Sequence, residues 1–223
     1  FDLSVARADK KLYCAEDPAV PGTSSASGQY APSAGHLLTP TLGALMKARD
    51  PRSRVVAVAG KDRAAIMMAG RGADEVLWLA PAGLTSYRGT ALSPMAGQAG
   101  RAIGAAITAA TPPLDLPLPC AARDIAIPLP SGGTVGTGRF ARAGDNFRAF
   151  LASPQADGAV LAAAAALRAD RKLGEGAGTD LLIVGLSATD YVGHAYGTEG
   201  AEMCQQILAM DRELGDFFAR LDA

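Results

Sequence analysis

Histidine and aromatic residues are scarce in this sequence of 223 residues, which contains two histidines and 5% aromatic residues. Two histidines leave any closed zinc site in this chain short of ligands. The low aromatic content disfavours an aromatic-rich sandwich, and the abundance of alanine and glycine favours helices packed tightly on a sheet. The sequence also lacks a Gly-x-Ser-x-Gly elbow, a Walker loop and a Rossmann glycine fingerprint, so the enzyme classes marked by those motifs find no support.

No charge sign dominates, since 21 basic and 22 acidic residues give a formal net charge of -1. These residues are scattered without blocks, so no long-range field would attract a polyanion, and we do not expect nucleic acid as a partner. The longest apolar run, at residues 158–170, is broken by charge well before the roughly 20 residues that cross a bilayer. We therefore expect no membrane segment.

The three cysteines, Cys14, Cys120 and Cys204, lie far apart and have neither CxxC nor zinc-finger spacing. One disulfide with one free thiol, or three reduced thiols, are both compatible with this pattern. The cysteines alone do not decide the compartment.

Hydrophobic patterning predicts a single α/β domain. Aliphatic runs without helical spacing at residues 54–59 and 181–184 are typical of strands buried on both faces. A helix at 62–69, ended by Gly70, separates the first of these from a strand at 75–79, and such a βαβ unit implies parallel pairing. We expect a further strand at 12–15 and further helices at 39–47, 95–110, 145–152, 155–172 and 198–221.

The sequence also predicts the surroundings of several individual residues. Thr39 is predicted to cap the helix at 39–47, with Leu42, Leu45 and Met46 forming its apolar face. Trp78 is predicted to lie in the core. The charged residues at 211–213 are predicted to face solvent, opposite the apolar stripe of the last helix.

Residues 81–144 interrupt the regular pattern of strands and helices. Glycine and proline recur there, with six prolines between residues 112 and 130. A segment of this kind between two regular α/β stretches is typical of an insertion rather than of a separate domain.

Polar side chains follow the strand at 181–184. Asp190 and His194 lie four residues apart beside Gly193, at the carboxyl end of the strand, where open α/β sheets keep their sites. A carboxylate and an imidazole are good zinc ligands. The alternative is that Asp190 caps the following turn and His194 is an ordinary hydrogen-bonded histidine, and the spacing alone does not decide. His36 is expected to be a solvated loop residue.

Two cations follow the strand at 54–59. Lys61 and Arg63 stand at a helix start, whose free amide groups favour anions, so they suit a phosphate or sulfate group. Arg63 offers a planar fork and Lys61 a point charge. The alternative is a solvated helix start capped by Asp62. Because the carboxyl ends of neighbouring parallel strands meet in one crevice, the two motifs together indicate metal-assisted phosphoryl transfer.

Several segments resemble the alkaline phosphatase superfamily, and more narrowly its threonine-nucleophile, zinc-dependent alkaline phosphatases of the Sphingomonas type. The resemblance covers nearly the whole chain except 81–144. It implies an alkaline-phosphatase-like α/β fold, a mostly parallel sheet flanked by helices, in which 1–223 form the central part of one domain and 81–144 an inserted cap. The segments that resemble the family are GKDRAAIMMAG at 60–70, SATDYVGHAYG at 187–197 and MDRELGDFFARLD at 210–222, together with 11–18 and 37–46.

Matched position by position, the resemblance implies that Asp190 and His194 bind one zinc ion of a two-zinc site. It also implies that Lys61 and Arg63 hold the phosphoryl oxygens of a small-molecule phosphate monoester. A monoester presents an extra charged oxygen for such cations, whereas the related diesterases lack the pair and accept a second ester group there.

The sequence departs from the family because no residue matches the threonine nucleophile, the phosphate-contacting asparagine or the remaining zinc ligands. In the family the asparagine segment lies just before the position of Phe1 and the further zinc ligands lie beyond that of Ala223, so the resemblance implies that this chain is the middle of an enzyme. The chain alone is then expected to have an incomplete site and little or no activity.

The first hypothesis is therefore the central part of a periplasmic or secreted, zinc-dependent alkaline phosphatase that acts through a phospho-threonine intermediate. One alternative is a phosphodiesterase or nucleotide pyrophosphatase of the same superfamily. Another is a non-catalytic module that binds an anion or a metal and has lost the other ligands.

Overall fold

The structure is a computed structural model, and it describes residues 12–20 and 29–222. Strands and helices alternate along most of the chain. In chain order the elements are α1 (Leu42–Arg49), β1 (Val55–Ala59), α2 (Asp62–Ala69), β2 (Glu75–Ala80), β3 (Gly83–Thr85), α3 (Pro94–Thr108), the 3-10 helix η2 (Leu118–Arg123), β4 (Ile127–Pro128), β5 (Thr134–Val135), α4 (Phe147–Leu151), α5 (Pro154–Arg171), β6 (Leu181–Gly185), α6 (Ala188–Tyr196) and α7 (Ala201–Leu221).

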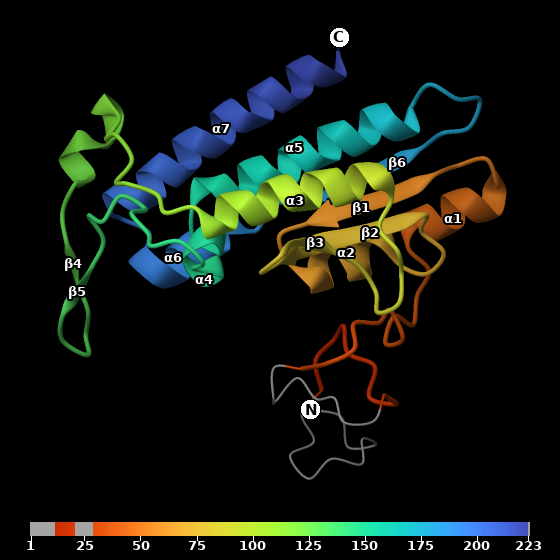
Figure 1. The fold of residues 1–223 in the computed structure, drawn as a ribbon, viewed down its shortest axis with the longest axis horizontal. Coiled ribbons are helices and arrows are strands. Elements are labelled where there is room, and N and C mark those ends of the chain that lie inside the picture. The colour runs from red at the N-terminus through yellow and green to blue at the C-terminus, as the bar shows by residue number, and fades with distance from the viewer. Residues whose placement is uncertain (1–11, 21–28, 223) are drawn as a thin grey trace.

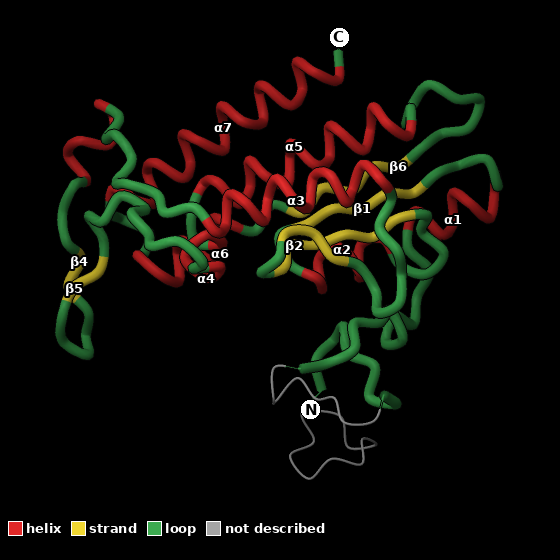
Figure 2. The backbone as a smooth tube through the Cα atoms, in the orientation of Figure 1, coloured by secondary structure: helices red, strands yellow, loops and turns green. Residues whose placement is uncertain are grey.

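The main sheet has the strand order β3-β2-β1-β6. Strand β1 lies between β2 and β6 and pairs in parallel with both, while β3 returns antiparallel to β2. Figure 2 shows these strands with helices on either side. The predicted α/β class, with a mostly parallel sheet flanked by helices, is confirmed.

Alternating side chains of the strands enter two cores on opposite faces of the sheet. Val56 and Val58 of β1 belong to the larger core, which includes residues of α3, α5 and α7. Ala57 and Ala59 point to the other face and pack with residues of α2. Alternation with a period of two residues is what a strand produces when both of its faces are covered. Helix α7 lies outside α5, as a further layer on the larger core (Figure 1).

Strand β6 is the edge of the sheet within the described residues. Its first four residues, at 181–184, are only half-buried, whereas all five residues of β1 are buried. The prediction of a strand buried on both faces is therefore confirmed for β1 and wrong for β6. The aliphatic run does not distinguish a central strand from an edge strand, because it is apolar in both cases.

The first part of the segment at 81–144 is built into the main layers. Strand β3 pairs with β2, and α3 packs against β3 so closely that a Cβ at Gly83 would lie 1.9 Å from the carbonyl oxygen of Gly100. Only the part after α3, with η2 and the hairpin β4–β5, stands away from the sheet (Figure 1). The inserted cap stays a prediction. Since β3 and α3 belong to the main layers, such a cap would consist of residues after Thr108.

The beginning of the chain differs from its predicted structure. The cap of α1 is Thr41, not Thr39, because the Thr41 hydroxyl oxygen accepts a hydrogen bond from the Ala44 amide at 3.3 Å. Leu42 and Leu45 are 64% and 55% exposed, so the predicted apolar face is wrong: α1 packs through its buried Gly43 instead. Residues 12–15 form no strand; beside them, Glu16 makes an isolated bridge with Pro32.

The last helix begins at Ala201, after the separate short helix α6, rather than at residue 198. Trp78 is buried, as predicted. The prediction that residues 211–213 all face solvent is wrong for Glu213, which turns toward α5: a Cβ at Gly158 would lie 2.8 Å from its Oε1 atom. Small residues on α5 let the two helices approach closely there. Phe1 and Ala223 lie outside the described residues.

Candidate functional site

Two turns meet at the carboxyl ends of β1 and β6. The strands are parallel and in register to their last residues, Ala59 opposite Gly185, and the Gly60 amide donates to the Gly185 carbonyl oxygen at 2.9 Å. A Cβ on Gly60 would lie 2.8 Å from the Cβ of Ser187, so only glycine lets the turn that leads to Lys61 lie against the turn that leads to α6.

Helix α6 holds both predicted metal ligands. Asp190 lies in its first turn and His194 in its last turn, so the four-residue spacing places the two side chains on one face. His194 Nε2 is 3.5 Å from Asp190 Oδ1, and the side chains are 81% and 53% exposed. The prediction placed them at the carboxyl end of the strand, without a helix. Their helical setting is what gives the spacing a geometric meaning.

Lys61 joins the two turns. Its Nζ forms an ion pair with Asp190 Oδ2, and it lies 4.5 Å from the centre of the Tyr191 ring. The hydrogen bond from Lys61, with the charges of Lys61, His194 and Arg63, lowers the pKa of the Asp190 carboxyl. Asp190 is therefore an anion at neutral pH, as a metal ligand must be. The alternative that Asp190 only caps a turn does not describe this contact.

Arg63 lies in the first turn of α2 and is held from the N-terminal loop. Its Nη1 donates to the Tyr13 hydroxyl oxygen at 3.3 Å, and this contact raises the pKa of Arg63. Tyr13 in turn donates to Asp62 Oδ1 at 2.9 Å, and Tyr30 donates to Asp62 Oδ2. Asp62 is not the N-cap, which is Lys61; it anchors the two tyrosines.

Three residues that support the site were missed by the sequence analysis. Tyr13 and Tyr30 lie in a segment rich in Gly, Pro and Ser, where no periodicity points to a partner. Asp157 lies in the first turn of α5, and its Oδ1 accepts from the backbone amide of Ser187 just before α6. An acidic residue in a first turn is expected to serve its own helix, so sequence gave no signal for this contact.

A cavity of about 550 Å³ lies between α4 and α6, beside His194. Its wall includes Arg148, Tyr191 and Tyr196. It offers a cation and two aromatic rings next to one predicted metal ligand.

Asp190 and His194 are residues of metal-ligand type, but by themselves they do not complete a metal site. Within 12–20 and 29–222, no group of three or more His, Cys, Asp or Glu side chains is placed to bind a metal. Asp190 and His194 supply two ligands of the types that zinc prefers.

His36 is half-buried rather than solvated as predicted, and its buried Nε2 has no hydrogen-bond partner among the described residues.

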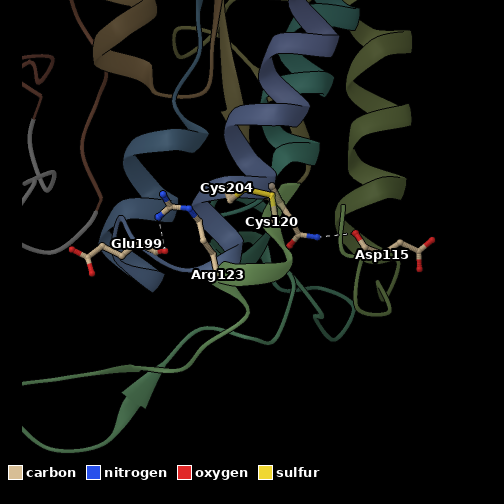
Figure 3. Close-up of a disulfide and its surroundings, with 6 residues drawn as sticks. Asp115, Cys120, Arg123, Glu199 and Cys204 are labelled. Atoms are coloured by element: carbon tan, nitrogen blue, oxygen red, sulfur yellow. Dashed lines mark hydrogen bonds between the residues drawn. A yellow bond between two sulfur atoms is a disulfide. The ribbon is translucent and has the colours of Figure 1, made fainter. Parts of the chain in front are cut away.

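The open choice between cysteine states is settled in the structure. Cys120 and Cys204 form a disulfide, and Cys14 is free and exposed. Figure 3 shows the disulfide linking η2 to the start of α7, where Arg123 also donates to the Glu199 carbonyl oxygen. No helix among the described residues has the length and hydrophobicity to cross a bilayer.

The fold, with a cation pair and metal-ligand types at the carboxyl edge of a parallel sheet, is that of an alkaline-phosphatase-like protein. A solved structure of wild-type alkaline phosphatase PafA matches with a TM-score of 0.73 and 27% identity, covering 95% of this chain and 44% of that chain. The chain belongs to the type I phosphodiesterase / nucleotide pyrophosphatase family, whose model matches residues 41–223.

Curated relatives agree with this assignment. Alkaline phosphatase PhoK of Sphingomonas sp is 50% identical over 224 residues, which cover 100% of this chain and 39% of PhoK. Alkaline phosphatase PhoD of Zymomonas mobilis is 39% identical over 232 residues and is covered to 38%. The resemblance noted in the sequence is confirmed, and the chain spans about two fifths of the length of these relatives.

Proposed function

We propose that this chain is part of a zinc-dependent phosphate monoester hydrolase that works through a phospho-threonine intermediate. The chain supplies Lys61 and Arg63 for the substrate phosphoryl group, and Asp190 and His194 for one of two zinc ions. The nucleophile and the other ligands are supplied outside residues 1–223. The observation that supports this most is the contact between Lys61 and Asp190, since it joins the cation pair and the metal ligands in one site.

The cations have one task in this proposal. Lys61 and Arg63 follow β1 at the amino end of α2, where helix amides add to the attraction for an anion. Together they can hold unesterified phosphoryl oxygens, Lys61 as a point charge and Arg63 as a fork. A monoester has one more such oxygen than a diester, so the pair favours monoesters.

One solved structure has a lysine and an arginine with the spacing seen here. A second PafA structure, with 25% identity, is of a variant substituted at a threonine, an asparagine, a lysine and an arginine, the last two standing two positions apart. Lys61 and Arg63 have that spacing.

Zinc, when bound by Asp190 and His194 with further ligands, would supply Lewis-acid stabilisation of oxygen charge. The ion pair with Lys61 favours the ionised form of Asp190, which is the form that binds a metal ion. A periplasmic or secreted location is proposed with this function. The Cys120–Cys204 disulfide supports it, because such bonds persist in oxidising compartments.

The test compares two substrate classes in the complete polypeptide that contains these residues. Lys61→Ala and Arg63→Ala should each lower kcat/KM for a phosphate monoester on the order of 10²-fold and for a diester much less. Lys47→Ala is the matched control, since Lys47 pairs with Asp74, away from the site. Monoester turnover that survives both substitutions would refute the proposed role of the cations.

The second candidate is a phosphodiesterase or nucleotide pyrophosphatase. The family description favours it, and so does the cavity beside His194, which has room for a second ester group. The same assay separates the two, because a diesterase would prefer the diester before any substitution. A non-catalytic module would hydrolyse neither substrate.

A further inference from the structure

A buried carboxylate on α5 binds the beginning of α6. Asp157 is 1% exposed, and its Oδ1 accepts from the amides of Ser187 at 2.8 Å and Ala188 at 3.0 Å. These are the residue before α6 and its first residue. Amides at a helix start have no partner within the helix, and the positive end of the helix dipole favours an anion there. Asp157 therefore acts as a cap supplied from another helix.

The second carboxylate oxygen is fixed from a third helix. Gln206 of α7 is fully buried, and its Nε2 donates to Asp157 Oδ2 at 3.1 Å. The same Nε2 lies 3.3 Å from the hydroxyl oxygen of Thr189, in the first turn of α6. No ion pair with Asp157 is found among the described residues, so its charge is balanced by amides alone. Burial raises the pKa of Asp157, while these three hydrogen bonds oppose that rise.

The position of α6 decides where the predicted metal ligands point. Asp190 follows Ala188 by two residues, and His194 follows one turn later. The Ser187 side chain makes no cap hydrogen bond of its own. The start of α6 therefore depends on Asp157 for the hydrogen bonds that set its orientation, and an unsupported first turn would fray.

We propose that Asp157 is a positioning residue that, together with Gln206, fixes the first turn of α6 and thereby aims Asp190 and His194 at the metal ion. Asp157 itself touches neither metal nor substrate. The metal part of this inference rests on the proposed function. The bracing of α6 does not.

The test uses the complete polypeptide, with two variants and one control. Asp157→Ala removes the cap, and Gln206→Ala removes the hydrogen bonds from Gln206 to Asp157 and to Thr189. Asp170→Ala changes an exposed carboxylate on the same helix, paired with the neighbouring Arg171. The readouts are the dissociation constant for Zn²⁺ alone, measured by chelator competition, and amide hydrogen exchange along the chain. Neither readout needs turnover.

Asp157→Ala should weaken Zn²⁺ binding by about 10- to 100-fold, the range found when residues behind metal ligands are removed. Exchange should accelerate in α6, at residues 187–194, and not in β1. Gln206→Ala should act in the same direction and more weakly, and it serves as the main variant if Asp157→Ala does not fold. Asp170→Ala should change neither readout.

The outcomes separate the two proposals. Faster exchange in α6 in a protein that does not bind Zn²⁺ at all would uphold the bracing and refute the zinc site. Unchanged exchange in α6 with unchanged Zn²⁺ affinity would overturn the role of Asp157. So would faster exchange that is uniform over the whole chain at unchanged affinity, since that describes a general loss of stability.

Discussion

The residue that supports Arg63 most directly is Tyr13. Its hydroxyl group donates to Asp62 and accepts from Arg63, so a single oxygen links the N-terminal loop to the first turn of α2. The ring also packs edge to face on Tyr30, with centroids 5.0 Å apart. Burial, with the neighbouring Asp62 charge, raises the pKa of Tyr13 to about 12, so the donor is retained at any physiological pH. Arg63 is thereby held in place in the first turn of α2.

Tyr13→Phe should remove both hydrogen bonds and leave the ring packing unchanged. We expect the free energy of unfolding to fall by about 1–2 kcal/mol, because one lost bond is to a charged carboxylate and the other is from a charged guanidinium. Urea unfolding measures this. Tyr87→Phe is the control: Tyr87 packs edge to face on Trp78, and no hydrogen bond of its hydroxyl is found among the described residues. An equal effect in both variants would show that the Tyr13 hydroxyl contributes nothing.

At the scale of elements, the sequence pattern predicted those strands and helices that are determined by residues close to one another along the chain. The aliphatic runs at 54–59 and 181–184 gave two strands, and their shared carboxyl edge brought Lys61 and Asp190 together. The pattern could not show that α6 is capped by Asp157, since that contact spans 30 positions. It also could not show which aliphatic strand is central, because burial depends on what lies beside it.

Residue type and position suggested zinc ligands and anion-binding cations but left their alternatives open, and the family resemblance favoured these roles for Asp190, His194, Lys61 and Arg63. The structure places these four residues at one edge of the sheet. It does not test what they bind, so these roles stay predictions.

The interface of α5 with α7 contains an acid that titrates near neutrality. Burial, with the charge of Asp157 next in weight, raises the pKa of Glu213 to about 7 from 4.5. One of its oxygens is buried without a hydrogen-bond partner among the described residues. A carboxyl whose pKa is raised on folding stabilises the fold below its unfolded pKa, and that stability is lost as the pH rises through the folded value.

Glu213→Gln should therefore flatten the pH dependence of stability between about pH 4.5 and 7. The wild type should lose about 1–2 kcal/mol across this window relative to the variant, less than the full shift implies because the site is only half-buried. Urea unfolding at pH 5 and pH 8 measures the difference. Asp211→Asn, on the exposed side of the same helix, is the control. If the free energy of unfolding of the wild type and of Glu213→Gln changed in parallel with pH, the raised pKa of Glu213 would be contradicted.

At the scale of the whole molecule, contacts at its base and farther out fasten the segment after α3. At its base, Arg142 is 7% exposed and donates to the carbonyl oxygens of Ile107 and Ala109 at the end of α3. Farther out, the Cys120–Cys204 disulfide joins η2 to α7 across 84 positions (Figure 3). Between these points the hairpin β4–β5 contributes no strand to the main sheet.

Removal of the disulfide tests whether this segment is an inserted cap. A crosslink that closes so long a loop restricts the unfolded chain and contributes about 2–4 kcal/mol if the segment unfolds with the sheet. If the segment is a cap, Cys120→Ser with Cys204→Ser should instead expose residues 111–141 to limited proteolysis, with a smaller change in urea unfolding of the sheet. Cys14→Ser is the control, since that thiol is free and exposed. Loss of the full crosslink energy in a single transition would show that the segment and the sheet are one cooperative unit.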